Sequence, residues 1–189
     1  MTLIRFALGA AASLLLFSAC AHNAPSAAPE TLPTIAHEPP APMPPPSTSE
    51  INGLPGSTVR GTAVFKNEGK TVHVLAEFTG LAPNTKHGIH IHEKGSCDGA
   101  KFEGAGGHYN PSSINHGGPH SKKRHAGDLG NLTSDANGYA KLDIRIPNGP
   151  DVDSFGGKSL VLHAKPDDLH SQPAGNSGDR IACGLIKMQ

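Results

Sequence analysis

Alternating apolar and polar positions mark two stretches of this chain as strands with one buried face. Between residues 72 and 78, apolar side chains fall at every second position: Val72, Val74, Ala76 and Phe78. The same period puts Leu142, Ile144 and Ile146 on one face of the second stretch, and Lys141, Asp143 and Arg145 on the other. Because a period of two belongs to strands, both stretches are predicted to lie over a core.

Turn sequences connect these stretches to further short strands. Asn-Glu-Gly at 67–69 joins 58–66 to 71–80, and Asp-Ala-Asn-Gly at 135–138 joins 128–133 to 139–146. Residues 87–92, 159–163 and 181–187 bring the set to seven, and no segment has a convincing helical period. Residues 46–57, rich in Ser, Pro and Gly, are poor strand material. We expect an all-β sandwich or barrel.

The first 50 residues differ in composition from the rest. Residues 1–20 hold one Arg, an apolar run too short for a membrane span, and then small residues, as in an export signal. Residues 21–50 are rich in Pro, Ala and Ser, which favours an extended, disordered tether. The compact domain is therefore predicted at 51–189.

The end of that signal, Leu-Phe-Ser-Ala-Cys, resembles the bacterial lipoprotein signal, with Phe17 where Leu is usual. The resemblance implies lipidation of Cys20 and a place in the bacterial cell envelope, on the periplasmic side. Since Ala21 follows Cys20, the outer membrane is favoured. The alternative is an ordinary cleaved signal in which Cys20 is incidental.

The composition argues against one class of partner and for an oxidising compartment. The formal net charge is zero and 17% of residues are charged, which argues against binding nucleic acid. With Cys20 set aside, Cys97 and Cys183 form an even pair in an exported chain, which suggests a disulfide.

Histidine is concentrated between Gly88 and Asp128. His90 and His92 are two positions apart, so on a strand their rings point to one face. A Gly/Pro/Ser-rich loop follows, and it carries His108, His116, His125 and Asp128. Four-coordinate nitrogen and oxygen sites suit zinc or copper, and a bound cation would hold such a loop in place. The alternative is a His-rich surface tract without fixed geometry.

Six motifs across 58–189 resemble, in order, the signatures of the copper,zinc superoxide dismutases: GIHIHE, GGHYNP, HGGP, RHAGDLGNLT, LVLHAKPDDL and DRIACGLI. The resemblance implies an immunoglobulin-like Greek-key β-barrel or sandwich of about eight antiparallel strands, with two long loops forming the metal site. One copper and one zinc per subunit are expected. The implied copper ligands are His90, His92, His108 and His163. The implied zinc ligands are His108, His116, His125 and Asp128, with His108 bridging the two metals.

The same resemblance assigns roles beyond the ligands. Asp167 links a copper histidine to a zinc histidine, and Arg180 guides superoxide to the copper, so that Arg180 and His108 form the catalytic set. Cys97 and Cys183 are paired in a disulfide, and His87 is a structural hydrogen-bonding residue. The remaining histidines match no ligand position and are expected to be solvated side chains: His22, His37, His73, His120 and His170.

The implied activity is dismutation of superoxide to dioxygen and hydrogen peroxide in the cell envelope. The alternative is a non-catalytic copper- and zinc-binding envelope lipoprotein, which would have no need of Arg180. Pro173 and Ala174 stand where the family has a guiding Lys and a Thr. Lys165 or the basic run 122–124 is a candidate substitute, although a solvated run is the default. Both a homodimer and a monomer are left open.

Overall fold

The computed structural model describes residues 46–188, in which eight strands and two short 3-10 turns form. The strands are β1 (Ser47–Gly53), β2 (Arg60–Glu68), β3 (Thr71–Thr79), β4 (Lys86–His92), β5 (Asp128–Thr133), β6 (Ala140–Pro147), β7 (Ser159–His163) and β8 (Arg180–Lys187). The turns are η1 (Glu103–Ala105) and η2 (Val152–Phe155). The predicted signal, Cys20 and residues 21–45 of the predicted tether lie outside the described residues. Within 46–188, no helix has the length and apolar character needed to cross a membrane.

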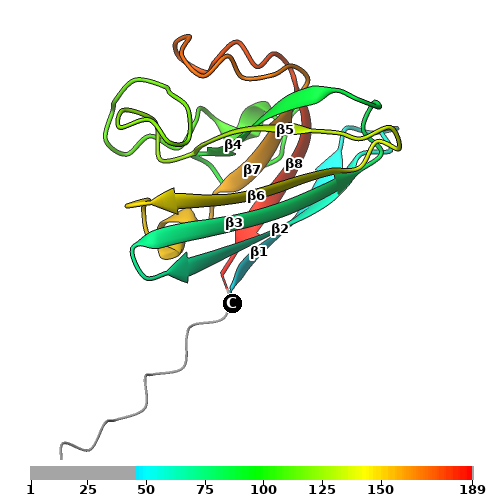
Figure 1. Cartoon of the computed structure of the whole chain (residues 1–189). Helices are drawn as coiled ribbons and strands as arrows, with labels where there is room; N and C mark the ends of the chain where they lie inside the picture. The colour runs from blue at the N-terminus through cyan, green and yellow to red at the C-terminus, as the bar shows by residue number, and fades with distance from the viewer. Residues whose placement is uncertain (1–45, 189) are drawn as a thin grey trace, which may run out of the picture. The chain divides into compact units, whose positions relative to one another are not determined.

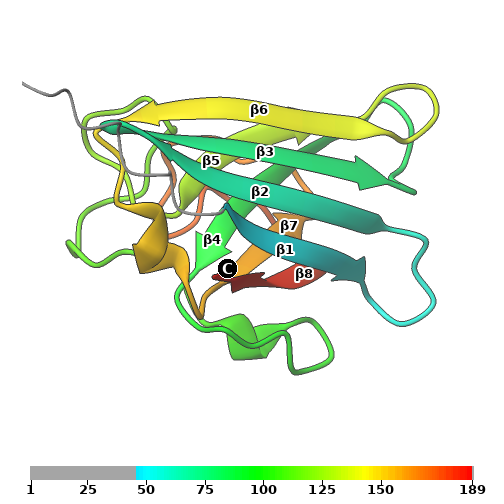
Figure 2. The same ribbon diagram turned by 90° about the horizontal axis from the view of Figure 1, so that it is seen from below.

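All eight strands belong to one antiparallel sheet that curls into a nearly closed barrel. The strand order is β5-β4-β7-β8-β1-β2-β3-β6, so three neighbouring pairs, β3–β6, β4–β7 and β8–β1, consist of strands that are not consecutive in the chain. The edge strands β5 and β6 approach one another and bring the sheet round on itself (Figures 1 and 2). The predicted all-β Greek-key architecture is confirmed.

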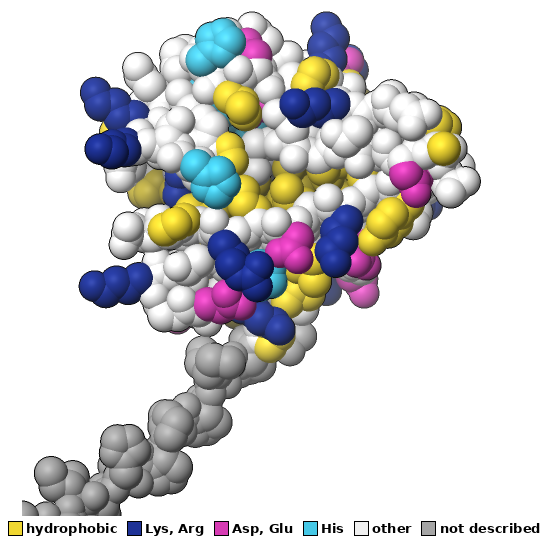
Figure 3. All heavy atoms as spheres, viewed as in Figure 1, with side chains coloured by type: hydrophobic (Ala, Val, Ile, Leu, Met, Phe, Trp, Pro, Cys, Tyr) yellow, Lys and Arg dark blue, Asp and Glu magenta, His cyan; other side chains and the backbone are white. Residues whose placement is uncertain are grey.

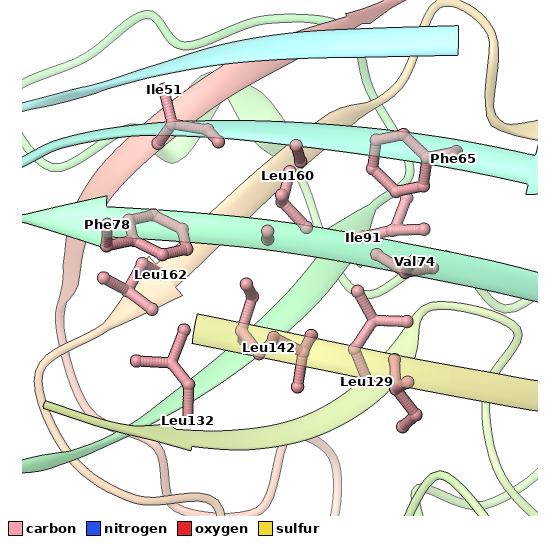
Figure 4. Close-up of a cluster of buried hydrophobic side chains, with 14 of the residues drawn as sticks. Ile51, Phe65, Val74, Phe78, Ile91, Leu129, Leu132, Leu142, Leu160 and Leu162 are labelled. Carbon is pink, nitrogen blue, oxygen red and sulfur yellow. The ribbon is translucent and has the colours of Figure 1, made fainter. Parts of the chain in front are cut away.

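The predicted alternation fills the inside of this barrel. Residues of β3 and β6 alternate between core and surface as the sequence indicated, with Val74 and Phe78 almost fully buried. Apolar side chains from strands on opposite sides of the barrel meet in its interior (Figure 4). Phe65 of β2 packs edge-on against Phe155 of η2, with 5.9 Å between ring centroids. Burial of this apolar surface is the main stabilising contribution to the fold.

Residues 46–57, whose composition is poor for a strand, do form one, because β1 occupies Ser47–Gly53. It also includes the last residues of the range predicted as a tether. Its alternation is real, but the inward positions are Ser47, Ser49 and Ile51, of which only the last is apolar. The backbone is fixed by pairing to β2 on one side and β8 on the other. Small polar side chains there conceal the pattern that sequence inspection relies on.

Strands β4 and β7 are buried on both faces, which sets them apart from the rest of the barrel. Ile89 and Ile91 of β4 face the core, while His90 and His92 face outward and are still no more than 1% exposed. Two long connections cover this outer face: the loop 93–127 between β4 and β5, and the loop 164–179 between β7 and β8 (Figure 1). The paired histidines therefore lie between a strand surface and its loops.

Truncating the core aromatic should destabilise the barrel strongly. Phe65→Ala removes a fully buried ring and leaves a cavity beside Phe155, so we expect the free energy of unfolding to fall by about 3–5 kcal/mol. Denaturant unfolding measures this. Lys66→Ala, at the neighbouring exposed position, serves as the matched control and should change the free energy by less than about 0.5 kcal/mol. Equal effects would contradict the packing described.

Candidate metal centre

Four histidine rings converge on the outer face of β4 and β7. His90 and His92 come from β4 and His163 from the end of β7, where a register shift after Leu162 displaces the strand. His108 arrives from the loop, where it forms an isolated bridge with His92. One nitrogen of each ring lies within 4.8 Å of the others, and the two Nε2 atoms of His92 and His163 are 3.3 Å apart. We call His90, His92, His108 and His163 the four-histidine group.

A second cluster shares one of these rings. His108, His116, His125 and Asp128 place one ligand atom each within 4.8 Å of one another, and all four are buried. We call them the histidine–aspartate group. Asp128 begins β5, opposite His90 in the sheet, so the strand pairing itself brings the two groups together. The structure thus brings together every histidine and aspartate that the sequence nominated as a ligand.

The free ring nitrogens point into these clusters. Three buried side-chain nitrogens have no hydrogen-bond partner among the described residues: His90 Nδ1, His108 Nε2 and His116 Nδ1. His116 Nδ1 lies 3.0 Å from Asp128 Oδ1, but the pair lacks hydrogen-bond geometry. An unpaired buried nitrogen is costly unless a ligand takes its lone pair. These atoms are therefore suited to coordinating cations.

Asp167 fixes one histidine of each group from behind. Its Oδ2 lies 2.9 Å from His90 Nε2, and its Oδ1 lies 2.9 Å from His116 Nε2. These contacts leave the Nδ1 of both rings directed into the clusters. The Asp167 backbone is held in turn by the amide side chain of Asn131, which bonds both its N–H and its carbonyl. The predicted linking carboxylate is therefore present, and outer partners of this kind orient ligand rings.

Asp128 is held ionised by its surroundings. Burial alone would raise the pKa of its carboxyl, but the hydrogen bond with His108, the adjacent ring of His116 and the hydrogen bond from the Gly117 N–H hold that pKa well below its usual range. The His125 N–H donates to the same carboxylate at 2.8 Å. Burial lowers the pKa of His116, but Asp128 and Asp167 outweigh this and raise it to about 9. The ionised Asp128 therefore favours a cation beside it, whereas burial lowers the pKa of His125 in the same group.

In the four-histidine group, three of the rings have lowered pKa values. Burial lowers the pKa of His90 to about 3, that of His92 to about 2 and that of His163 to about 4. The neighbouring ring of His108 adds to the effect at all three. These three imidazoles are therefore neutral at neutral pH, the form in which histidine binds metals.

Arg180 stands beside the four-histidine group and is fixed by backbone carbonyls. Its guanidinium donates to Phe102 O and Gly106 O, both at 2.6 Å. Gly106 O also accepts from Nδ1 of His92, at 2.9 Å. The segment carrying these carbonyls is joined to β8 by the disulfide between Cys97 and Cys183, which confirms the predicted pairing.

Two lysines contact the residues that precede Arg180 in the chain, Gly178 and Asp179, and only one of the two was predicted as a candidate. The side chain of Lys165, a predicted candidate, lies against Gly178. Of the other candidate, the run 122–124, Lys122 and Arg124 line a cavity to which no residue of the four-histidine group contributes. Lys101 Nζ is 2.9 Å from Asp179 Oδ2, next to Arg180 in the chain. Because Lys101 and Asp179 are 78 residues apart, no local pattern signals their contact.

The remaining histidines fall outside both groups. His87 binds His163 O through Nδ1 and Thr85 Oγ1 through Nε2, so its predicted structural role is confirmed. His120 and His170 are exposed, as expected, and His22 and His37 lie outside the described residues. His73 was expected to be solvated, and this is wrong: its ring is clasped between Glu68 and Asp143 on the outer face of β3 and β6.

Comparison with known sequences gives one consistent result. The family model described as copper/zinc superoxide dismutase (SODC) matches residues 59–186. Superoxide dismutase (Cu-Zn) of Paramecium bursaria Chlorella virus 1 is 41% identical over 140 residues, which cover 68% of this chain and 72% of that protein. Superoxide dismutase (Cu-Zn) 2 of Aquifex aeolicus (strain VF5) is 40% identical over 147 residues, which cover 74% of this chain and 85% of that protein.

The fold has a similar solved counterpart. A crystal structure described as that of the clock protein EA4 superposes with a TM-score of 0.68 at 33% sequence identity. The match covers 80% of this chain and 99% of that one. The likeness therefore extends over the whole barrel and its loops.

Removing the charge of Asp167 should loosen the histidine–aspartate group. In Asp167→Asn, the hydrogen bonds that orient His90 and His116 are weakened, so we expect zinc affinity to fall about 10–100-fold. Competition with a chromogenic chelator measures it. Asp168→Asn, whose carboxylate bonds Ser171 and Asn176 instead, is the matched control and should keep the parent affinity. A loss shared by both variants would point to general disruption of the loop.

Proposed function

Because this chain belongs to the copper/zinc superoxide dismutase family, we propose that its two buried clusters hold the copper and the zinc with which it converts superoxide to dioxygen and hydrogen peroxide. The copper ligands in this proposal are His90, His92, His108 and His163. The zinc ligands are His108, His116, His125 and Asp128. The observation that supports this most directly is the placement of His108, whose Nδ1 belongs to one cluster while its buried Nε2 has no protein partner.

The donor sets suit the two metals. Three nitrogens and one carboxylate, all buried, match a closed zinc site. Neutral imidazoles suit copper in both of its common oxidation states. When bound, copper supplies a reversible one-electron redox change, and zinc supplies a fixed positive charge.

The proposed reaction also requires protons. Two superoxide anions and two protons give one dioxygen and one hydrogen peroxide, so the net reaction consumes protons but needs no outside reductant. In our proposal, Nε2 of His108 would hold one of these protons whenever it is not bound to the copper. This nitrogen is buried and has no hydrogen-bond partner among the described residues, while Nδ1 of the same ring lies 2.9 Å from Asp128 Oδ1.

Arg180 supplies the positive charge that an anion meets on its way in. Its guanidinium is held by two carbonyls, not by a carboxylate, so its charge is not neutralised by an ion pair among residues 46–188. Its donors are thereby fixed beside the four-histidine group. A fixed cation of this kind raises the encounter rate of a small anion.

We further propose that the domain works in a bacterial cell envelope, attached through lipid-modified Cys20. The support is the amino-terminal sequence and the disulfide, a bond that persists in oxidising compartments. Metabolic labelling with a radioactive fatty acid tests the attachment: the full chain should be labelled and Cys20→Ser should not. An unlabelled parent chain that is released as a soluble protein would overturn it.

Replacing the copper ligand at the end of β7 tests the proposed activity. His163→Gln should lower dismutation at least 100-fold while the chain still holds one zinc, because His163 is absent from the histidine–aspartate group. Metal content and turnover are measured on one purified sample. His170→Gln, an exposed control, should retain both. Near-parental turnover of the His163 variant would refute the ligand assignment.

Neutralising Arg180 should slow capture of the anion. For Arg180→Gln we expect kcat/KM to fall about 10-fold and its decline with ionic strength to become flatter, because steering is screened by salt. Pulse radiolysis over a range of salt concentrations measures both. Arg145→Gln removes a charge already paired with Glu68 and should leave the salt profile as it is. An unchanged profile in the Arg180 variant would show that another group guides superoxide.

A further inference from the structure

A cavity of about 640 Å³ lies between the loop that carries His116 and His125 and the turn that follows β6. Residues 111–126 form one wall, and residues 147–150 form the other. The volume is in the range of small-molecule sites. Four prolines line the cavity, Pro111, Pro119, Pro147 and Pro150, and their fixed backbone angles make its walls stiff. None of the residues of the four-histidine group lines it.

The charged side chains that line this cavity are all basic. Lys122 and Arg124 line it together with His120, and its lining contains no Asp or Glu. Neither of the two cations has a carboxylate within 4.0 Å among residues 46–188, whereas Arg145 on β6 has two. Figure 3 shows Lys and Arg side chains projecting where Figure 1 draws the loop 111–126, with no acidic side chain visible between them. The carboxylate of Asp128, behind this wall, is directed to His108, Gly117 and His125.

The same walls hold donors that the protein itself does not use. The hydroxyls of Ser112 and Ser121 and the side-chain amide of Asn148 make no hydrogen bond with any other residue of the described part of the chain. Arg124 uses Nη1 to bond His125 O at 2.8 Å and has further N–H groups to offer. Hydroxyl, amide and guanidinium donors around paired cations are the groups that bind phosphate and sulfate oxygens.

We propose that this cavity is a binding site for a small polyanion that carries phosphate or sulfate groups. Lys122 and Arg124 neutralise its charge from the loop wall, and Asn148 contacts it from the opposite wall. A smaller cavity of about 270 Å³ shares Asn148, Gly149 and Pro150, but both Lys70 and Asp151 line it, so the anionic groups of the ligand are assigned to the larger cavity. The ligand thus joins the loop to the turn that follows β6 across the cavity.

Binding of sucrose octasulfate to the full chain with its metals tests the proposal. Titration calorimetry should give saturable binding, and its Kd should rise about 10-fold in Lys122→Gln. Lys123→Gln is the matched control, since it removes an adjacent exposed charge that is outside the cavity lining, and it should keep the parent Kd. Equal weakening by both substitutions would reduce the effect to general attraction by a basic run and overturn the site.

The opposite wall supplies an independent check. Asn148 has a positive φ of 51°, a conformation that Asp also tolerates, so Asn148→Asp adds a negative charge to the cavity without a new backbone conflict. It should also raise the Kd about 10-fold. If it leaves the Kd unchanged, the anion does not occupy the cavity and the proposal fails.

Vesicles distinguish the sources of the anionic group. Inorganic sulfate should compete with sucrose octasulfate, and vesicles of phosphatidylglycerol should compete only if a lipid headgroup enters the cavity. Either result supports the site, with a soluble ligand in the first case and a lipid headgroup in the second. If the chain binds these vesicles while neither soluble probe binds, the attraction belongs to the surface and the cavity site is refuted.

Discussion

The carboxylate of Asp167 connects parts of the molecule that the hydrophobic core does not reach. It contacts His90 on β4 and His116 in the long loop, while its own backbone is fixed by Asn131 on β5. Phe102 and Ala105 pack the first part of the loop 93–127 against Val161 and Cys183. The parts of both loops that lie around His116 and Asp167 are polar, so apolar burial does not hold those parts closed. Charged hydrogen bonds in a buried setting replace it, and they are stronger than neutral ones. With Asp128 acting in the same way nearer the barrel end, two carboxylates hold the loops that complete the site.

The two faces of β4 have different roles: one packs in the core, and the other carries the histidines of the site. Ile89 and Ile91 belong to the core and give the strand its position, and His90 and His92 project from the other side. The barrel therefore provides a rigid base on which ring orientation is set within the sheet, and loops provide the remaining groups. Burial then keeps the three lowest-pKa rings neutral, which is the form that the chemistry needs.

The sequence predicted the regular parts of this arrangement well. Alternation located β3 and β6, and the spacing of His90 and His92 correctly placed both rings on one face of a strand. It did not reveal β1, because Ser47 and Ser49 take inward positions where an apolar residue is expected. The clasp on His73 and the contact of Lys101 with Asp179 were also missed. Both depend on how distant strands and loops pack, which neither periodicity nor spacing encodes.

The carbonyl of Gly106 serves two partners at once, Nδ1 of His92 and the guanidinium of Arg180. Arg180 and the His92 ring therefore share one backbone support, and the segment that carries it is attached to β8 through the disulfide between Cys97 and Cys183. A shift of this single peptide group would therefore displace the guanidinium and the imidazole together, so that the distance between them depends on one carbonyl oxygen.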